Sequence, residues 1–134
     1  MGVIYLNRKY LEDIIPKEEI FGYHDKSDER HERWCRQEEE YGFCDIETWD
    51  LDSAFAQIIY ERLMMYKEIG GEVVDLTYHT YTYLGEEKTT LELIDMMIEK
   101  CKVAIKESSV STDHVDIMDE VYTILKICHK SLWW

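Results

Sequence analysis

The densest group of side chains that could carry out chemistry is a run of carboxylates ahead of the longest helical pattern. Asp45, Glu47, Asp50 and Asp52 lie within eight residues of one another. Paired carboxylates can do acid–base work, and several together can hold Mg²⁺ or Ca²⁺, but the spacing lacks the glycine and final glutamate of an EF-hand loop. Acids also stabilise the first turn of a helix. We therefore interpret Asp45 or Asp50 as the helix cap and Trp49 as an apolar plug that seats the helix.

Metal ligation and nucleophilic catalysis are the other chemistries to test. His31 and Cys35 stand four residues apart on an expected helix, so both could face one ion, and His24 and Cys44 could complete a tetrahedron. No Cys-x-x-Cys pair accompanies them. The chain also lacks a nucleophile elbow, a phosphate-binding glycine loop and a dinucleotide fingerprint. We expect no cofactor, no metal beyond the weak candidates His31 and Cys35, and no enzymatic activity.

Aromatic and acidic side chains provide candidate binding surfaces. If Tyr78 faces inward on a strand, then His79, Tyr81 and Tyr83 share the opposite face. Such a ladder could stack on a base or anchor a protein, and the alternative is that a helix covers it. The candidate binding residues are Glu38, Glu39, Glu40, Tyr78, His79, Tyr81 and Tyr83.

The charge of the chain limits its partners. The 134 residues include 29 Asp and Glu against 15 Lys and Arg, which gives a formal net charge of −14. Such a surface repels nucleic-acid phosphates and attracts basic proteins, although it also promotes solubility. We expect no direct nucleic-acid binding. No apolar run reaches the ~20 residues that span a bilayer, and the first residues do not follow the order of a signal peptide, so we expect a cytoplasmic protein without a membrane partner. In that compartment the four cysteines are expected to be reduced.

The spacing of apolar residues, together with capping residues, Gly and Pro, predicts the helices and strands that must position these residues. We expect short strand and helix segments within 1–26, a helix capped by Ser27 or Asp28 that runs to about Tyr41, and a helix over 51–69. A β-hairpin is expected near 73–89, and the pair Thr89 and Glu92 forms a capping box for the next helix. A last helix follows a cap at 111–113. The sequence thus predicts a single α+β domain over 1–134, mainly α, with three to five helices packed on one small antiparallel hairpin.

The apolar faces of three helices follow from the same spacing. For residues 51–69 the face is expected to be Leu51, Phe55, Ile58, Ile59, Leu63, Tyr66 and Ile69. The next helix places Ile94, Met97 and Cys101 on one side, and the last places Val121, Ile124 and Cys128 on one side. Cys101 and Cys128 are therefore expected to act as small buried hydrophobes.

The segment around the carboxylates also resembles a protein family. Its pattern is Gly-Phe or Gly-Tyr, an Asp, and then Thr-Trp-x-Leu-Asp ahead of an amphipathic helix; here these positions are Gly42, Phe43, Asp45, Thr48, Trp49, Leu51 and Asp52. It is similar to uncharacterised small proteins encoded by tailed phages and prophages of gut bacteria, over roughly residues 30–134. The resemblance implies a setting, the cytoplasm of an infected bacterial host, and no catalytic residues. The signature residues are expected to be structural.

Three functions of different classes follow. The first is a phage-derived, non-enzymatic acidic protein that binds a host or phage protein with a basic surface, for example a counter-defence inhibitor that mimics nucleic acid and blocks a host nuclease. The second is a protein that binds or sequesters a small ligand such as a nucleotide signal. The third and weakest is a metal-dependent enzyme. A homodimer is a further expectation.

Overall fold

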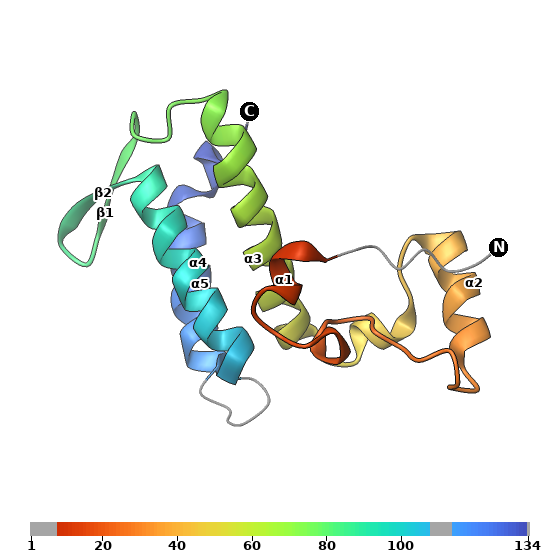
Figure 1. Cartoon of the computed structure of the whole chain (residues 1–134). Helices are drawn as coiled ribbons and strands as arrows, with labels where there is room; N and C mark the ends of the chain where they lie inside the picture. Colours follow the sequence, from red (N-terminus) through yellow and green to blue (C-terminus); the bar gives the residue numbers. More distant parts are fainter. Residues whose placement is uncertain (1–7, 108–113, 134) are drawn as a thin grey trace.

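The structure, a computed structural model, describes residues 8–107 and 114–133 of the chain (Figure 1). Within them the expected α+β architecture, mainly helical with one antiparallel hairpin, is confirmed. The strand segment expected near residues 3–6 and the cap expected at 111–113 lie outside the described residues. In the described ranges, no helix combines the length and apolar character needed to cross a bilayer.

Three helices form the body of the molecule: α3 (Leu51–Ile69), α4 (Thr90–Glu107) and α5 (His114–Cys128). Helix α4 packs against both α3 and α5 (Figure 1). The faces expected for α4 and α5 are confirmed, since Met97, Cys101, Ile124 and Cys128 are among the fully buried side chains. Burial raises the pKa of the Cys101 thiol to about 12 and that of Cys128 to about 11, so both behave as small hydrophobes.

The start of α4 is fixed by the capping box that the sequence predicts. The Glu92 N–H donates to Thr89 Oγ1 at 3.1 Å, and the Thr89 N–H donates to Glu92 Oε1 at 3.0 Å. The bonds from Thr89 lower the pKa of the Glu92 carboxyl. Two carbonyl groups of the loop before the hairpin accept hydrogen bonds from the first residues of α4. The Thr90 N–H donates to the His79 carbonyl, and the Leu91 N–H donates to the Leu76 carbonyl. These bonds satisfy amides that the first helical turn leaves unpaired.

The hairpin is shorter than the sequence predicts. Strand β1 (Thr80–Tyr83) pairs antiparallel with β2 (Glu86–Thr89), and the connecting Leu84 and Gly85 both have positive φ angles. The expectation of strand from residue 73 is wrong: α3 continues into the 3₁₀ turn η3 (Gly70–Glu72), and residues 73–79 form a loop. Asp75 Oδ1 accepts the Thr77 N–H at 2.9 Å and the Thr77 hydroxyl at 2.6 Å. This side-chain turn replaces the ladder bonds of a strand.

The buried face of α3 agrees with the expectation only in part. Leu63 is buried and Ile59 and Tyr66 pack against the core, as expected, but Leu51, Phe55 and Ile69 are exposed. The unexpected buried residues are Ala54, Ala56, Gln57 and Tyr60. The N-terminal segment, with α1 (Lys9–Glu12) and the 3₁₀ turn η1 (Lys17–Glu19), supplies the reason, because α1 contacts α3 and the backbone of this segment bonds to Gln57.

Gln57 joins this segment to α3. Its Oε1 accepts the Phe21 N–H at 2.8 Å, and its Nε2 donates to the Glu19 carbonyl at 3.0 Å. A buried glutamine with both ends bonded to backbone is therefore part of the packing and not a defect in it.

A second group of elements lies to one side of the three-helix body (Figure 1). It contains α2 (His31–Tyr41) and the 3₁₀ turn η2 (Asp45–Thr48), and η2 contacts both α2 and α3. The expected cap at Ser27 or Asp28 is wrong, because α2 begins at His31 and Asp28 Oδ1 instead accepts the Arg30 N–H at 2.8 Å in the preceding turn. Hydrogen bonds from the Arg30 side chain and backbone hold the pKa of Asp28 at about 2.

Candidate functional site

The end of α2 presents acidic and aromatic side chains together. Gly42 ends the helix with φ 84°, and its N–H donates to a carbonyl four residues earlier at 2.9 Å. Glycine adopts this left-handed conformation without steric cost. The rings of Tyr41 and Phe43 lie on either side with centroids 6.4 Å apart, and they are 62% and 51% exposed. Glu39 and Glu40 are exposed beside them. The predicted acidic binding residues therefore adjoin two rings that were not among the predicted binding residues.

Trp34 anchors this region. Its side chain is 1% exposed, and its Nε1–H donates to Asp45 Oδ1 at 2.9 Å. The Trp49 ring meets it edge-on at 5.9 Å, and the Arg30 guanidinium lies 4.9 Å and 5.3 Å from the two ring centroids. Trp49 itself is 58% exposed. The expectation that Trp49 plugs the core is therefore wrong, because Trp34 already occupies that position and Trp49 covers its edge.

Asp45 ties η2 to α2. Its carboxylate accepts hydrogen bonds from Trp34, from Gln37 at 3.0 Å and from Arg33, while its own N–H donates to Gln37 Oε1 at 2.8 Å. Burial would raise the pKa of Asp45, but these donors outweigh it and hold the pKa below its usual value. The interpretation of Asp45 as a cap of α3 is wrong, since α2 supplies its donors. Asp50 does occupy the position before α3, yet it makes no capping hydrogen bond.

The other signature residues lie along the η2–α3 junction. The Thr48 hydroxyl donates to the Asp45 carbonyl at 2.7 Å. Leu51 and Asp52 are exposed in the first turn of α3. The carboxylates of residues 45–52 thus have separate roles and do not form one catalytic pair.

A different set of groups converges at η2. Glu38, Cys44 and Glu47 each place one ligand atom within 4.8 Å of the others. Cys44 is 2% exposed, and its N–H and thiol both donate to Glu47 Oε2, at 2.9 Å and 3.5 Å. Burial, followed by the charge of Glu47, raises the pKa of the Cys44 thiol to about 12 and also raises that of Glu38. A thiol and two carboxylates are zinc ligands in chemical type, but Cys44 and Glu47 already satisfy each other as a helix-capping pair.

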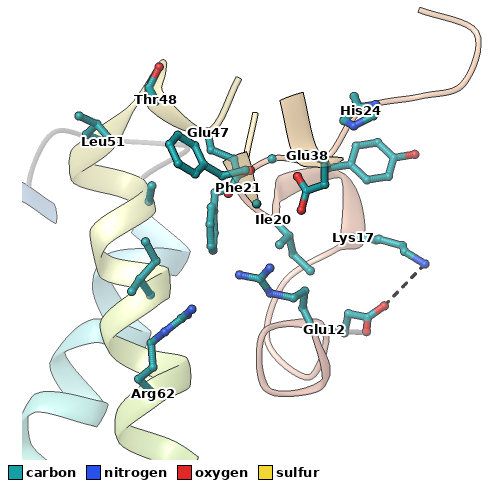
Figure 2. A pocket seen from close by; sticks show the side chains of 17 residues that line it. Glu12, Lys17, Ile20, Phe21, His24, Glu38, Glu47, Thr48, Leu51 and Arg62 are labelled. Atoms are coloured by element: carbon teal, nitrogen blue, oxygen red, sulfur yellow. Dashed lines mark ion pairs between the residues drawn. The ribbon is translucent and has the colours of Figure 1, made fainter. Parts of the chain in front are cut away.

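Glu38 and Glu47 border a pocket of about 530 Å³ between the N-terminal segment, the end of α2, η2 and α3 (Figure 2). The Arg8 guanidinium lies 4.5 Å from the Phe21 ring centroid and makes two 2.9 Å hydrogen bonds to Glu61. Charged residues of both signs line the pocket: Arg8, Glu12, Lys17, Glu38, Glu47 and Arg62. Its volume is within the roughly 300–1,000 Å³ of small-ligand sites.

At one wall of the pocket the Gly22 backbone closely approaches the Glu47 side chain. Gly22 has φ 83°, and a Cβ there would lie 2.7 Å from Glu47 Cγ. This pocket is not predicted from the sequence, because its walls come from segments that are distant in sequence. The available signals were Gly22 itself and the three-residue spacing of Cys44 and Glu47.

The weak metal candidates do not form the expected tetrahedron. His31 Nε2 lies 3.3 Å from Cys35 Sγ, but His31 Nδ1, on the other side of the ring, lies 2.7 Å from His24 Nδ1. One ion cannot bind both nitrogens of a single ring. Cys44 instead belongs to the group with Glu38 and Glu47, so the four-ligand arrangement is wrong.

The predicted aromatic ladder is divided between the core and the surface. Tyr83 is 7% exposed, and the Tyr81 hydroxyl bonds the Ser131 hydroxyl. Tyr78 is 77% exposed and lies in the loop, where its ring meets His79 edge-on at 5.0 Å. An exposed ladder of His79, Tyr81 and Tyr83 is therefore not formed, because Tyr83 is part of the core, Tyr81 packs against it, and α5 contacts β1.

Comparison of the chain with protein-family models, with curated proteins and with solved structures finds no significant match.

Proposed function

We propose that the chain is a non-enzymatic binding protein that engages a basic protein through residues 28–50, called here the acidic arm. The observation that carries this proposal is the exposed pair Tyr41 and Phe43 beside Glu39 and Glu40. Exposed aromatic rings at a helix end are suited to be anchors, because a few aromatic residues supply most of the free energy of typical interfaces.

The charge of the arm supports a basic partner. It contains nine acids and three arginines. Two of these arginines pair within the arm, Arg30 with Asp28 and Arg33 with Asp45, so much of its positive charge is matched internally. Within the described residues, Glu39 and Glu40 form no ion pair. Exposed acids of this kind favour fast association with a basic surface, and their attraction to it weakens as the salt concentration rises.

The finer form of the proposal is a counter-defence inhibitor that mimics nucleic acid and occupies the groove of a host nuclease. It rests on the net charge of −14 and on the phage-like pattern of residues 42–52. In this form the protein acts in the cytoplasm of an infected bacterium.

Affinity capture from host lysate with matched variants tests the proposal. The wild-type protein is expected to retain a specific basic protein at low salt. The double variant Tyr41→Ala/Phe43→Ala should bind it at least about 30-fold more weakly, the equivalent of about 2 kcal/mol. Tyr78→Ala is the matched control, because it removes an even more exposed aromatic ring outside the arm. Capture of nothing specific, or equal capture by the double variant, would refute the proposal.

A second function, small-ligand binding, is favoured by the pocket of about 530 Å³. A nucleotide signal could stack beside Phe21 and place its phosphate near Arg8 and Arg62, as the second sequence-based hypothesis requires. A thermal-shift screen of nucleotides tests it, because a bound ligand must raise Tm. Arg62→Gln should reduce the shift without changing protein capture. If no nucleotide raises Tm at millimolar concentration, this function is excluded.

A further inference from the structure

The pocket of about 530 Å³ opens beside the surface that is proposed to bind a partner. It is larger than a second pocket, of about 250 Å³, that the loop of residues 73–79 and η4 (His129–Ser131) border. Phe43 belongs to the exposed aromatic pair of the acidic arm and also lines the larger pocket. A partner held on Tyr41 and Phe43 would therefore place its own side chains at the entrance of this pocket.

Two carboxylates of the acidic arm converge in the larger pocket. Glu38 and Glu47 each place one oxygen within 4.8 Å of the other (Figure 2). Both bonds from Cys44 to Glu47 use Oε2, which leaves Oε1 as an acceptor. Among the described residues, neither of the two carboxylates forms an ion pair. Because adjacent carboxylates repel each other, a cation placed between them is stabilised by both.

The basic residues of the pocket are matched by other acids. The Lys17 ammonium lies 3.9 Å from Glu12 Oε1. The Arg8 and Arg62 guanidinium groups both bond to Glu61, at 2.9 Å and 3.0 Å. The positive charge of the lining is therefore already engaged, in contrast to the two carboxylates of the arm.

The charge of Arg8 does not balance these two carboxylates. It lowers the pKa of Glu38, but burial and the charge of Glu47 outweigh it, so the pKa of Glu38 is raised. Figure 2 shows Arg62 further along α3, away from Glu38 and Glu47. The end of the pocket that the acidic arm forms thus keeps unbalanced negative charge, which is complementary to a cationic group of a basic partner.

Aromatic rings among the walls select the shape of that cation. Phe21, Tyr23 and Phe43 line the pocket, and the Arg8 guanidinium already lies 4.5 Å from the Phe21 ring centroid. A guanidinium group is planar, stacks on aromatic faces and can donate to two carboxylates at once. An ammonium group is compact and more strongly hydrated, so it gains less from such walls.

We infer that the larger pocket receives an arginine side chain of the basic partner, with its guanidinium between Glu38 and Glu47 and its aliphatic stem against Phe43. Arginine stems commonly pack on apolar surface while the charged end is held by polar groups. This inference rests on the proposed protein binding and adds the type of residue that the partner must present. It does not use Arg62, which the nucleotide hypothesis requires.

Titration of the ¹⁵N-labelled full chain with N-acetyl-arginine N-methylamide, followed by NMR, tests the inference. The probe should shift the amide signals of residues 38–48 and bind with a millimolar Kd, because it supplies a single side chain. The citrulline derivative has a similar shape but no charge, and it should bind at least about 10-fold more weakly, since a hydrogen bond to a charged group is worth about 1.5–3 kcal/mol. The lysine derivative should bind less tightly than the arginine derivative.

Substitutions that change charge equally separate the pocket from the general field of the arm. Glu38→Gln removes one of the two converging charges and should weaken the arginine probe about 10-fold. Glu39→Gln is the matched control, because it makes the same charge change at the next residue of α2, which is not among the residues that line the pocket. It should leave binding of the probe unchanged. The inference is overturned if the arginine probe shifts no signal of residues 38–48, if the citrulline derivative binds as tightly, or if both variants weaken the probe equally.

Capture of the partner distinguishes failure of this inference from failure of the proposed function. If Tyr41→Ala/Phe43→Ala abolishes capture but Glu38→Gln leaves it unchanged, the acidic arm binds the partner and the pocket receives no arginine, which overturns the inference alone. If the chain captures nothing specific and the arginine probe still binds at residues 38–48 with the expected selectivity, the proposed protein binding fails and the assignment of the pocket to arginine is supported.

Discussion

Replacement of Gln57 by leucine tests how the N-terminal segment is held on α3. Leucine has a side chain of similar size but no amide group, so it leaves the Phe21 N–H and the Glu19 carbonyl without their partners. An unsatisfied buried group costs about 1–3 kcal/mol, and the lower half of that range applies here because both bonds are part-buried. For the two groups together, we therefore expect Gln57→Leu to lower the free energy of unfolding by about 2–4 kcal/mol. For a chain of this length that corresponds to a Tm decrease of roughly 6–16 °C.

Urea unfolding followed by far-UV circular dichroism measures this change. The midpoint should fall while the slope m stays constant, since the surface exposed on unfolding is unchanged. Phe55→Leu is the control, because it places leucine at an exposed position of the same helix and should change stability by less than about 0.5 kcal/mol. If Gln57→Leu is as stable as this control, the two hydrogen bonds do not hold the segment.

Gln57→Glu adds a pH test of the same bonds. Ionised glutamate keeps the acceptor for the Phe21 N–H but has no donor for the Glu19 carbonyl, whereas protonated glutamate restores the donor. Its pKa in the folded state should therefore lie above the unfolded value of about 4.3. The stabilisation that the bound proton contributes is present below the unfolded pKa and is lost as the pH rises through the folded pKa. The loss of unfolding free energy of Gln57→Glu relative to wild type should therefore be smaller at pH 4 than at pH 7. An equal loss at both pH values would contradict the assignment.

Two further substitutions test the larger pocket. Gly22→Ala should lower Tm more than Gly85→Ala does. Both glycines have positive φ, but only the new Cβ at Gly22 would meet another residue, Glu47 Cγ at 2.7 Å. If the two substitutions lower Tm equally, no clash occurs at Gly22. Glu38→Gln should raise Tm at pH 7 and leave it unchanged near pH 4. Burial and the charge of Glu47 raise the folded pKa of Glu38, so its contribution to stability is present below the unfolded pKa and is lost as the pH rises through the folded one. A similar Tm change at both pH values would show that charge is not the cause.

The helices whose ends and buried faces depend on residues close in sequence were predicted from the sequence. The capping box of Thr89 and Glu92 and the apolar spacing of α4 lead directly to its start and its buried face. The extent of α3 was predicted in the same way. Its buried face was predicted only in part, because Gln57 is buried only when a segment more than thirty residues earlier supplies backbone partners.

Tertiary partners also decided the roles of the acids at residues 45–52. Sequence spacing places Asp45 at a helix start, but three donors on α2 bind its carboxylate. The alternation at residues 73–79 predicts a strand, yet the Asp75 side chain forms a turn with Thr77, and Leu76 is buried under the loop. The pockets could not be predicted, since each is bounded by segments that only the fold brings together.

Amide hydrogen exchange of the chain with and without a captured partner tests the central claim most directly. If the acidic arm is the binding surface, the partner should slow exchange at residues 38–49, and the protection should weaken as salt is raised. Residues 73–89 should exchange at the same rate in both states. Protection of residues 73–89 with no change in the acidic arm would contradict the account.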